Sequence, residues 1–471
     1  MELLLQNIGI IGNAKIALNG LTVICGSNNS GKSTAGKALY ATVESLNNLD
    51  IKFHEELAVN FRKALFSISR ILDLDSVIRY IDLEKISSKY EIYLDRLINA
   101  SFRFQRVNDE ETDVLSEIQA IKYSIERLNS QVLLDCSKKS KSDLPKRVIA
   151  YLKNFDEAKE KALALINEMS CFSSENASKE FAEKSFASLL AAEFKGQIFP
   201  INLNAKEKKS IVRLTKNEEV GFDATIYEKK DIVVTIKPDY KLFVSNAIYI
   251  EDPYILDKLS SYEDDMAFIY RFRFDRFDYS HNSKLIRLLT RKSVASLIEQ
   301  SINETKYEEI IEKINRVIPG VLSKKDSGFY YEEPNKTPLK VQNLATGAKM
   351  FSIVRNLLEK GEINFDTILI LDEPEAHLHP EWQNVFAEII VLLIKELNTT
   401  VLLTTHSPNF LMALEAYSKQ YKLNSRTSFY MAKHDNERYT VEYECVNERL
   451  SEIYSTFASP LIQVKKIKGQ D

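Results

Sequence analysis

The chain has 471 residues and a formal net charge of −4, with 44% apolar and 28% charged residues. This is the composition of an ordinary globular protein, and the length is enough for two or three domains. The weak negative charge excludes a global basic excess of the kind that attracts nucleic acid, although a local basic patch remains compatible with it.

Neither disulfides, a cysteine-based zinc site nor a membrane segment is predicted. The four cysteines are widely scattered and form no C-x-x-C pair. The three-leucine run after Glu2 is too short for the apolar region of a signal peptide. No stretch reaches about eighteen uninterrupted apolar residues, the length that a membrane span needs. We therefore expect a cytoplasmic protein without membrane contact.

The N-terminal region predicts short strands, and the last of them leads into a phosphate-binding loop. Apolar Leu21–Cys25 precedes Gly26-Ser27-Asn28-Asn29-Ser30-Gly31-Lys32-Ser33, which fits G-x-x-x-x-G-K-[ST] without mismatch, and helix-compatible Thr34–Leu46 follows. Successive backbone N–H groups and the helix dipole attract phosphate in this context. We expect Lys32 to reach the β- and γ-phosphates and Ser33 to ligate Mg²⁺. The nucleotide-binding residues predicted here are Gly26, Asn28, Asn29, Ser30, Gly31, Lys32, Ser33 and Thr34.

The next region, up to about residue 185, predicts helices. Apolar residues recur at steps of three and four between Leu115 and Val132, which is typical of an amphipathic or short coiled-coil helix. The lysine-rich segment 138–147 is interpreted as a solvated turn between helices rather than a phosphate contact.

The second half of the chain alternates between strands and helices. Strands are predicted at 211–214, 231–236 and 242–244, and mostly helix at 255–318. Strand–helix alternation toward residue 404 predicts a parallel α/β core. The segment 270–277 interleaves aromatic residues with arginines; buried aromatics with exposed arginines are favoured there over a grip on single-stranded nucleic acid.

Two further motifs carry chemistry. The apolar run Ile368–Leu371 ends in Asp372 and Glu373, as in a strand that is buried on both faces. In P-loop enzymes the first acid holds Mg²⁺, and we expect Glu373 to orient or deprotonate the attacking water. His406 follows the next apolar strand, and a γ-phosphate sensor is favoured there over a capping or core histidine.

The phosphate-binding loop, the strand that ends in Asp372 and Glu373, and His406 follow one another along the chain. Motifs in this order resemble the nucleotide-binding head of the ABC ATPase superfamily. The resemblance covers roughly 1–46 and 186–415, and it implies an α/β P-loop head with a mixed sheet, ATP and Mg²⁺ as cofactors, and ATP hydrolysis. Gln197 stands where such heads have a glutamine loop, although a lone glutamine before a strand is as typical of plain polar surface.

The signature loop departs from the family. Leu-Ser-Gly-Gly-Gln is replaced by Leu344-Ala345-Thr346-Gly347-Ala348, so Ala345 stands where a serine would face the partner's γ-phosphate. Thr346 offers a hydroxyl, and Gly347 opens a helix with free backbone N–H groups. The resemblance implies at least a head-to-head homodimer driven by ATP, and it allows a higher assembly of such dimers. The altered loop predicts dimerisation that is weaker or slower than in the family, and slow hydrolysis.

The long insertion resembles SMC-like and OLD-like ATPases that act around nucleic acids. Asp372 to Pro380 resembles that branch; its H-x-H, His377 and His379, lacks a nearby third ligand, and a loop at the dimer interface is favoured over zinc. The residues after His406 show neither the acidic set of a Toprim nuclease nor a His-Asn-His array, so any nuclease is expected in another chain.

The tail is similar to the PtuA-type ATPase subunits of Septu antiphage defence, which also occur beside some retrons. The matching stretches are 406–411, 415–418, 429–432, 447–454 and 457–461. The resemblance implies a regulator or sensor of a small PtuB-like HNH nuclease, with a retron reverse transcriptase and its nucleic acid as further partners. The alternative is an SMC-like ATPase of DNA repair or chromosome structure.

Four regions follow from these patterns and resemblances. Residues 1–46 form the first part of the head, 47–185 the helical insertion, 186–415 the rest of the head, and 416–471 a C-terminal segment. The apolar pattern near 448–464 indicates either a docking helix for a partner or a cover for the head's own core, and the two readings stay open.

Overall fold

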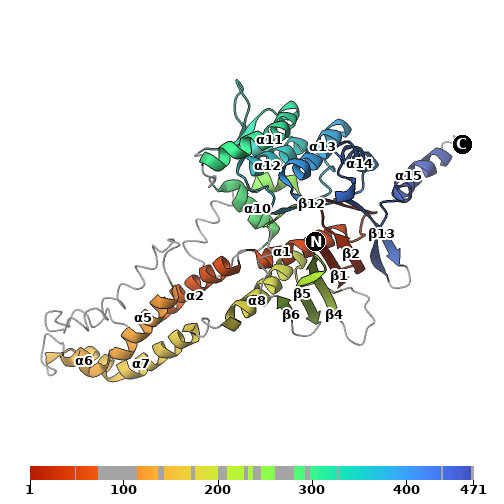
Figure 1. The fold of residues 1–471 in the computed structure, drawn as a ribbon. Helices are drawn as coiled ribbons and strands as arrows, with labels where there is room; N and C mark the ends of the chain where they lie inside the picture. The colour runs from red at the N-terminus through yellow and green to blue at the C-terminus, as the bar shows by residue number, and fades with distance from the viewer. Residues whose placement is uncertain are drawn as a thin grey trace. The chain divides into compact units, whose positions relative to one another are not determined.

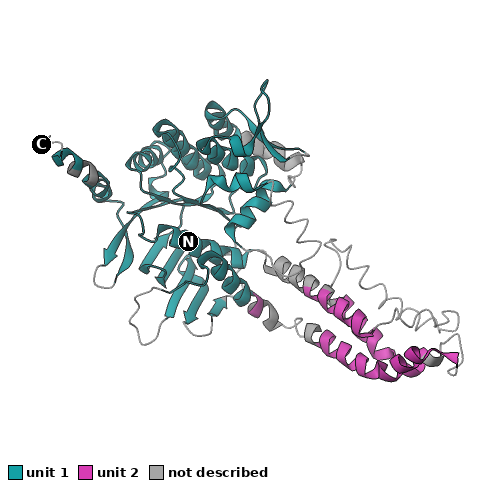
Figure 2. Cartoon of the chain, turned by 180° about the vertical axis from the view of Figure 1, so that it is seen from behind, with its two compact units in different colours: residues 1–47, 182–471 teal, residues 48–181 magenta. Residues whose placement is uncertain are grey.

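The structure, a computed structural model, describes residues 1–47, 49–72, 114–135, 143–170, 175–199, 209–227, 232–236, 246–259, 280–291, 297–325, 328–435 and 439–467. The chain forms two compact units (Figure 2). The head unit combines residues 1–47 with 182–471, and the helical unit comprises residues 48–181. None of the described helices is long and apolar enough to cross a membrane.

An eleven-stranded mixed sheet organises the described part of the head unit, in the order β6-β5-β4-β1-β2-β14-β13-β3-β12-β11-β7. Neighbouring strands β7, β11, β12, β3 and β13 are parallel, whereas β2, β1, β4, β5 and β6 form an antiparallel half. The strands are β1 (Glu2–Ile8), β2 (Ile11–Ala17), β3 (Leu21–Cys25), β4 (Lys209–Lys216), β5 (Glu219–Tyr227), β6 (Ile232–Ile236), β7 (Asn246–Ile250), β11 (Thr367–Asp372), β12 (Thr400–Thr405), β13 (Thr427–Asp435) and β14 (Thr440–Cys445).

Both faces of the parallel half are covered, which explains why its strands are continuous apolar runs. In β11, Ile368 and Ile370 join one core, whereas Leu369 and Leu371 join the other. One face is covered by α1 (Lys32–Leu46), and the other by α10 to α14 (Figure 1). The helices of that second face are α10 (His281–Thr290), α11 (Leu297–Val317), α12 (Thr346–Glu359), α13 (Pro380–Leu397) and α14 (Pro408–Gln420).

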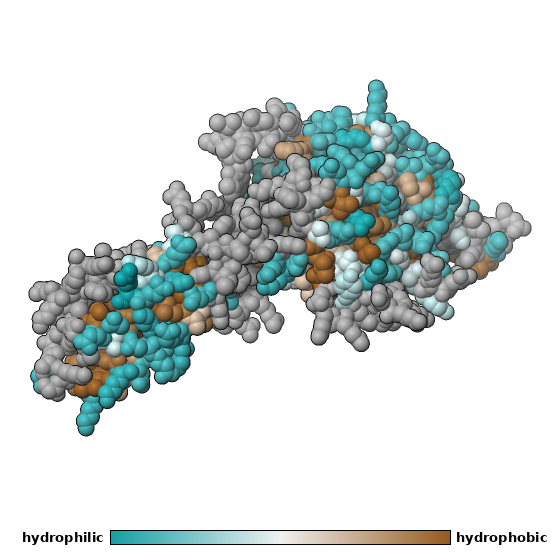
Figure 3. All heavy atoms as spheres, turned by 60° about the horizontal axis from the view of Figure 1, so that its bottom comes forward, coloured by the Kyte–Doolittle hydropathy of each residue, from teal (hydrophilic) through white to brown (hydrophobic). Residues whose placement is uncertain are grey.

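Smaller elements complete the described head. A second, three-stranded sheet holds β8 (Val321–Lys325), β9 (Gly328–Glu332) and β10 (Leu339–Lys340). Single 3₁₀ turns occur at η5 (Pro253–Lys258), η6 (Val341–Asn343) and η7 (Asn424–Arg426). On the face in Figure 3, hydrophilic side chains predominate and apolar atoms gather in patches between them.

The helices of the helical unit pack around one apolar core. This core is formed by α2 (Leu49–Leu72), α5 (Val114–Arg127), α6 (Ser130–Asp135) and α7 (Lys146–Ser170). The unit also includes the start of α8 (Glu175–Phe194). Ile118, Ile121 and Ile125 of the predicted stripe are at most 1% exposed in that core, together with Phe61 and Phe155 of α2 and α7. The apolar residues spaced by three and four therefore lie on a face that is buried in the structure.

Several predicted elements can be compared with the structure. Strands at 211–214 and 231–236 are confirmed as β4 and β6. The sequence reading missed β5, whose apolar residues alternate with polar ones because the strand is only half buried. Segments 242–244, 270–277 and most of 138–147 lie outside the described residues.

The first half of the C-terminal helix α15 (Leu450–Ile467) packs on the core of the head unit. Ile453 is 1% exposed in the core, and Leu450, Tyr454 and Phe457 pack against it. Farther along, Ile467 is 85% exposed. The first half of the helix thus serves as a core cover, the second of the two readings of this segment.

Candidate active site

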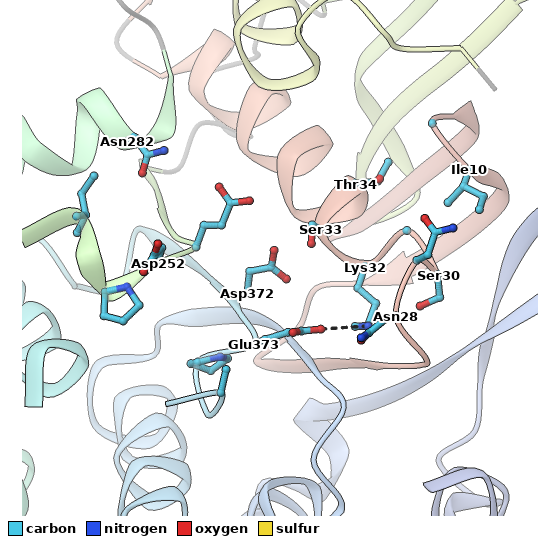
Figure 4. A pocket seen from close by; sticks show the side chains of 18 of the residues that line it. Ile10, Asn28, Ser30, Lys32, Ser33, Thr34, Asp252, Asn282, Asp372 and Glu373 are labelled. Carbon is cyan, nitrogen blue, oxygen red and sulfur yellow. Dashed lines mark ion pairs between the residues drawn. The ribbon is translucent and has the colours of Figure 1, made fainter. Parts of the chain in front are cut away.

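A cavity of about 1070 Å³ opens where the carboxyl ends of β3, β11 and β7 meet at one edge of the sheet. The start of α1 faces Asp372 and Glu373 across it, and Asp252 and Asn282 lie farther from the loop (Figure 4). Such edges of parallel sheets are where ligands bind in α/β proteins. Of the sequence-predicted residues, the cavity is lined by Asn28, Asn29, Ser30, Gly31, Lys32, Ser33, Thr34, Gln197, Asp372 and Glu373.

The glycines of the phosphate-binding loop are required by its backbone. Gly31 has φ +75°, and a Cβ there would lie 2.8 Å from Ile10 Cγ2. A Cβ on Gly26 would lie 2.7 Å from Ser30 Oγ. Side chains at either position would force the loop to move, so the phosphate cradle depends on both glycines.

The Lys32 ammonium is held at the loop. Its Nζ donates to the carbonyl oxygens of Gly26 (3.2 Å) and Ser27 (2.9 Å), and it pairs with Glu373 Oε1 at 3.2 Å. The lysine side chain is 5% exposed, whereas the glutamate is 31% exposed. The buried ammonium therefore pairs with a partly exposed carboxylate, whose place a phosphate group can take.

Asp372 is oriented by two hydroxyl donors. Thr404 Oγ1 donates to its Oδ1 at 2.5 Å, and the Tyr249 hydroxyl donates to its Oδ2 at 3.1 Å. Burial, and then the Asp372 charge, raise the pKa of Tyr249 well above its usual value, so this donor stays neutral. Asp372 and Ser33 face each other in Figure 4, and a carboxylate with a hydroxyl is a donor set that suits Mg²⁺.

Ser30 supplies a second sign that the cavity fits a phosphate ligand. It is 1% exposed, and its hydroxyl has no hydrogen-bond partner among the described residues. Buried hydroxyls without partners are rare in folded proteins. A phosphate oxygen in the loop would give this donor its acceptor.

Glu373 connects the loop lysine to His406. Its backbone has φ 48°, an uncommon region for a residue with a side chain, and its N–H donates to Thr404 Oγ1 at 3.0 Å. One carboxylate oxygen pairs with Lys32, and the other lies 3.2 Å from His406 Nδ1. This geometry places the glutamate carboxylate between Lys32 and His406.

Glu375 supports the segment that carries these groups. It is 1% exposed and accepts hydrogen bonds from Thr405 Oγ1 (2.5 Å) and the backbone N–H of His406 (3.3 Å). Burial raises the pKa of Glu375 above its usual value, against the effect of those hydrogen bonds. It ties the end of β12 to the loop after β11.

The signature-like residues lie outside the lining of this cavity. Ala345 precedes α12, and Thr346 Oγ1 donates to the Tyr254 hydroxyl at 3.0 Å. A Cβ on Gly347 would lie 3.1 Å from the His377 carbonyl oxygen. Contact between this segment and a second subunit's nucleotide stays a prediction.

The two histidines of the H-x-H string have different environments. His377 lines the cavity, whereas His379 is the N-cap of α13 and 70% exposed. The described residues contain no group of three or more His, Cys, Asp or Glu side chains that could hold a metal ion.

Residues 1–411 match the protein family described as "AAA ATPase domain". The chain belongs to this family. No curated protein matches the chain.

Among solved structures, the chain is similar to SMC head domains at low identity. The SMC head domain of Thermotoga maritima is 10% identical in sequence to this chain. The match covers 94% of this chain and 98% of that one, and the TM-score is 0.37. The second structure is the Smc head domain with an extended coiled coil bound to the C-terminal domain of ScpA, from Pyrococcus furiosus. Its identity is 12%, the match covers 97% of this chain and 98% of that one, and the TM-score is 0.38. Values this low say nothing about function.

The sequence reading missed several residues of this AAA family ATPase that line the cavity. Glu251 and Asp252 follow β7, and Asn282 lies at the start of α10. The sequence pattern could have indicated Glu251 and Asp252. An apolar run that ends in two acids precedes Pro253, in the same way as the run before Pro374. Nothing in the local sequence around Asn282 marked it.

Proposed function

We propose that the cavity binds ATP with Mg²⁺ and hydrolyses it. Backbone N–H groups of the loop and Lys32 hold the phosphates, and Ser33 and Asp372 hold the metal ion. The bound Mg²⁺ supplies neutralisation of the phosphate charge. Glu373 orients the attacking water, and His406 donates to the γ-phosphate; positioning and electrostatics then lower the barrier.

The observation that carries this proposal is the bridging position of Glu373. Its carboxylate contacts both Lys32 and His406 beside the oriented Asp372. When phosphate takes its place at Lys32, the freed carboxylate lies next to the phosphate with a vacant acceptor oxygen. This is what a water-orienting base needs.

The head is further proposed to close on a second copy. In that arrangement Ala345, Thr346 and Gly347 of one head meet the ATP of the other, and the helix start of α12 offers backbone N–H groups. Ala345 carries no hydroxyl, so closure and hydrolysis are slower than with a serine.

At the level of the cell, we propose a nucleotide-driven regulator of an antiphage nuclease complex. The tail resemblance to Septu-type ATPases supports this role, with a small HNH nuclease as partner and, in a retron context, a reverse transcriptase with its nucleic acid. The candidate docking segment is the end of α15, where Val464 and Ile467 are exposed.

The test is a pull-down of tagged Glu373→Gln protein from its native cells, with mass spectrometry and extraction of nucleic acid. An HNH nuclease in the eluate supports the defence role, and ATP analogues should then change the activity of that nuclease. Unchanged nuclease activity with and without analogues refutes the regulatory role.

The alternative is an SMC-like ATPase of DNA repair or chromosome structure, favoured by the long helices α2 and α7 with their shared core. DNA-stimulated ATP hydrolysis, with DNA and repair proteins but no nuclease in the pull-down, would support it instead.

A further inference from the structure

A chain of buried and half-buried charged groups ends at the cavity wall, and none of its members belongs to the motifs described above. Its cavity end is Glu251, which follows β7. Ile250 of β7 pairs with Leu371 of β11 in parallel register, so Glu251 and Asp372 leave the sheet at the same level. Glu251 lines the cavity and keeps 35% of its side chain exposed.

Two cationic groups hold the Glu251 carboxylate. Oε1 pairs with Lys37 Nζ of α1 at 3.0 Å, and Oε2 lies 3.1 Å from His281 Nε2. Although the geometry of the contact is not that of a regular hydrogen bond, the interaction with His281, against burial, and then those with Lys37, lower the pKa of Glu251 to about 2. The group is therefore an anionic acceptor at neutral pH.

His281 is itself fixed by a second carboxylate. Its side chain is 5% exposed, and Nδ1 lies 2.7 Å from Glu193 Oε2 at the end of α8. Glu193 Oε1 also accepts from the His281 backbone N–H at 2.8 Å. Both ring nitrogens thus face carboxylates, an arrangement that suits the doubly protonated ring.

Aromatic rings fix the plane of the imidazole. The Tyr249 ring lies 4.4 Å from it, centroid to centroid, at 31°, and Tyr40 meets it edge-on at 6.0 Å. Tyr249 is also the residue whose hydroxyl orients Asp372. The orientations of Glu251 and Asp372 therefore depend on one packed group of side chains.

From this geometry we propose that Glu251 is a further carboxylate of the hydrolytic site, and that His281, held by Glu193, is the positioning residue that aims it. The inference rests on the proposed ATP site. A carboxylate repels the γ-phosphate directly, so its contact in the nucleotide complex is a water molecule, whose O–H donates to it. If these side chains had only a structural role, their contacts would serve to hold α1, α8, α10 and β7 together.

A matched pair of variants at His281 separates the two roles. The amide nitrogen of Gln reaches the place of Nε2 and keeps a donor for Glu251, whereas that of Asn reaches the place of Nδ1 and serves only Glu193. We expect His281→Gln to retain kcat within about threefold, and His281→Asn to lower it about 10- to 100-fold, the effect of one hydrogen bond to a charged group. Glu251→Gln should match His281→Asn, and Glu251→Asp should lie between.

Binding and spectroscopy supply readouts other than turnover. ATP affinity, measured with a fluorescent analogue, should stay within about threefold in all four variants, because phosphate binding rests on the loop. In ¹⁵N-histidine NMR of the nucleotide-free protein, Glu251→Gln should shift the His281 Nε2 signal and leave its Nδ1 signal in place. The chain has six histidines, and His281→Gln identifies the signal by its loss.

Wild-type kcat in both His281→Asn and Glu251→Gln would overturn the proposal. So would a joint loss of ATP binding and thermal stability in all variants, since that is the signature of a structural tie. If His281→Asn does not fold, the partly exposed Glu251→Gln carries the test. Failure of the ATP site itself would show separately, as absence of ATP binding or hydrolysis by the wild-type protein.

Discussion

Replacement of Glu373 by Gln gives the most direct test of the hydrolytic site. In the structure this carboxylate pairs with Lys32 and lies 3.2 Å from His406 Nδ1. Gln keeps the size of the side chain and one acceptor oxygen but removes the charge and the ability to take a proton. The variant should therefore affect hydrolysis and binding in opposite directions.

The structure sets the size of both effects. Loss of a positioned base lowers kcat about 10²- to 10⁴-fold. ATP must displace Glu373 from Lys32, and that pair, at 3.2 Å with a glutamate 31% exposed, is worth about 1 kcal/mol or less. Removing the competing carboxylate should thus tighten ATP binding by up to about fivefold.

The assay combines phosphate release under saturating ATP with titration of ATP into the protein. Glu381→Gln is a matched control. Like Glu373, Glu381 follows β11 in the sequence, but it is 86% exposed, and among the described residues its carboxylate pairs only with His379, at 4.0 Å. A kcat for Glu373→Gln within tenfold of the wild-type value refutes the assignment of the base. A tenfold loss of ATP affinity refutes the competition between glutamate and phosphate.

Three further predictions follow from the structure. Lys32→Ala should weaken ATP binding about 10- to 100-fold, the value of a charged hydrogen bond, measured by calorimetry; wild-type affinity would remove Lys32 from the site. Phe351→Ala should lower the free energy of unfolding by about 3–5 kcal/mol, because the ring is fully buried and 5.2 Å from that of Phe386; a loss below 1 kcal/mol in urea would contradict the packing. Burial lowers the pKa of His281, but the interactions with the carboxylates of Glu193 and then Glu251 outweigh it, so the pKa is raised. The stability from this group is full below its unfolded pKa of about 6.5 and is lost as pH rises through the folded value. The difference in urea midpoint between wild type and His281→Gln should then be larger at pH 6 than at pH 9. A difference that grows as the pH rises would contradict a raised pKa of His281.

Much of the fold could be predicted wherever the determinant is local. The apolar run of β11 predicted a strand that is buried on both faces, and both faces are covered in the structure. The apolar runs of β3 and β12 likewise predicted strands. The apolar stripe from Leu115 to Val132 predicted helix with one buried face, and its isoleucines lie in the core of the helical unit. In contrast β5, half buried with alternating polar residues, has too weak a pattern to stand out.

The phosphate-binding loop and the pair Asp372–Glu373 were predicted for the same reason. A phosphate cradle needs glycines, a lysine and a helix start in one contiguous segment, so its chemistry is visible in a short string. A strand that ends in acids likewise delivers them to a known edge of the sheet. Their placement around one cavity confirms the expected neighbourhood, whereas their catalytic roles stay predictions.

Taken alone, the sequence determined that the chain carries a phosphate-binding loop, an acidic strand end and a helical insertion. Only the tertiary structure decided which distant side chains join them. Strand β7 becomes the neighbour of β11 although over a hundred residues separate them, and this brings Glu251 to the cavity. Glu193 and His281 meet because α8 and α10 end and begin at the same place. Spatial order in a sheet is set by packing of its faces rather than by chain order, so no local pattern could have paired these charges.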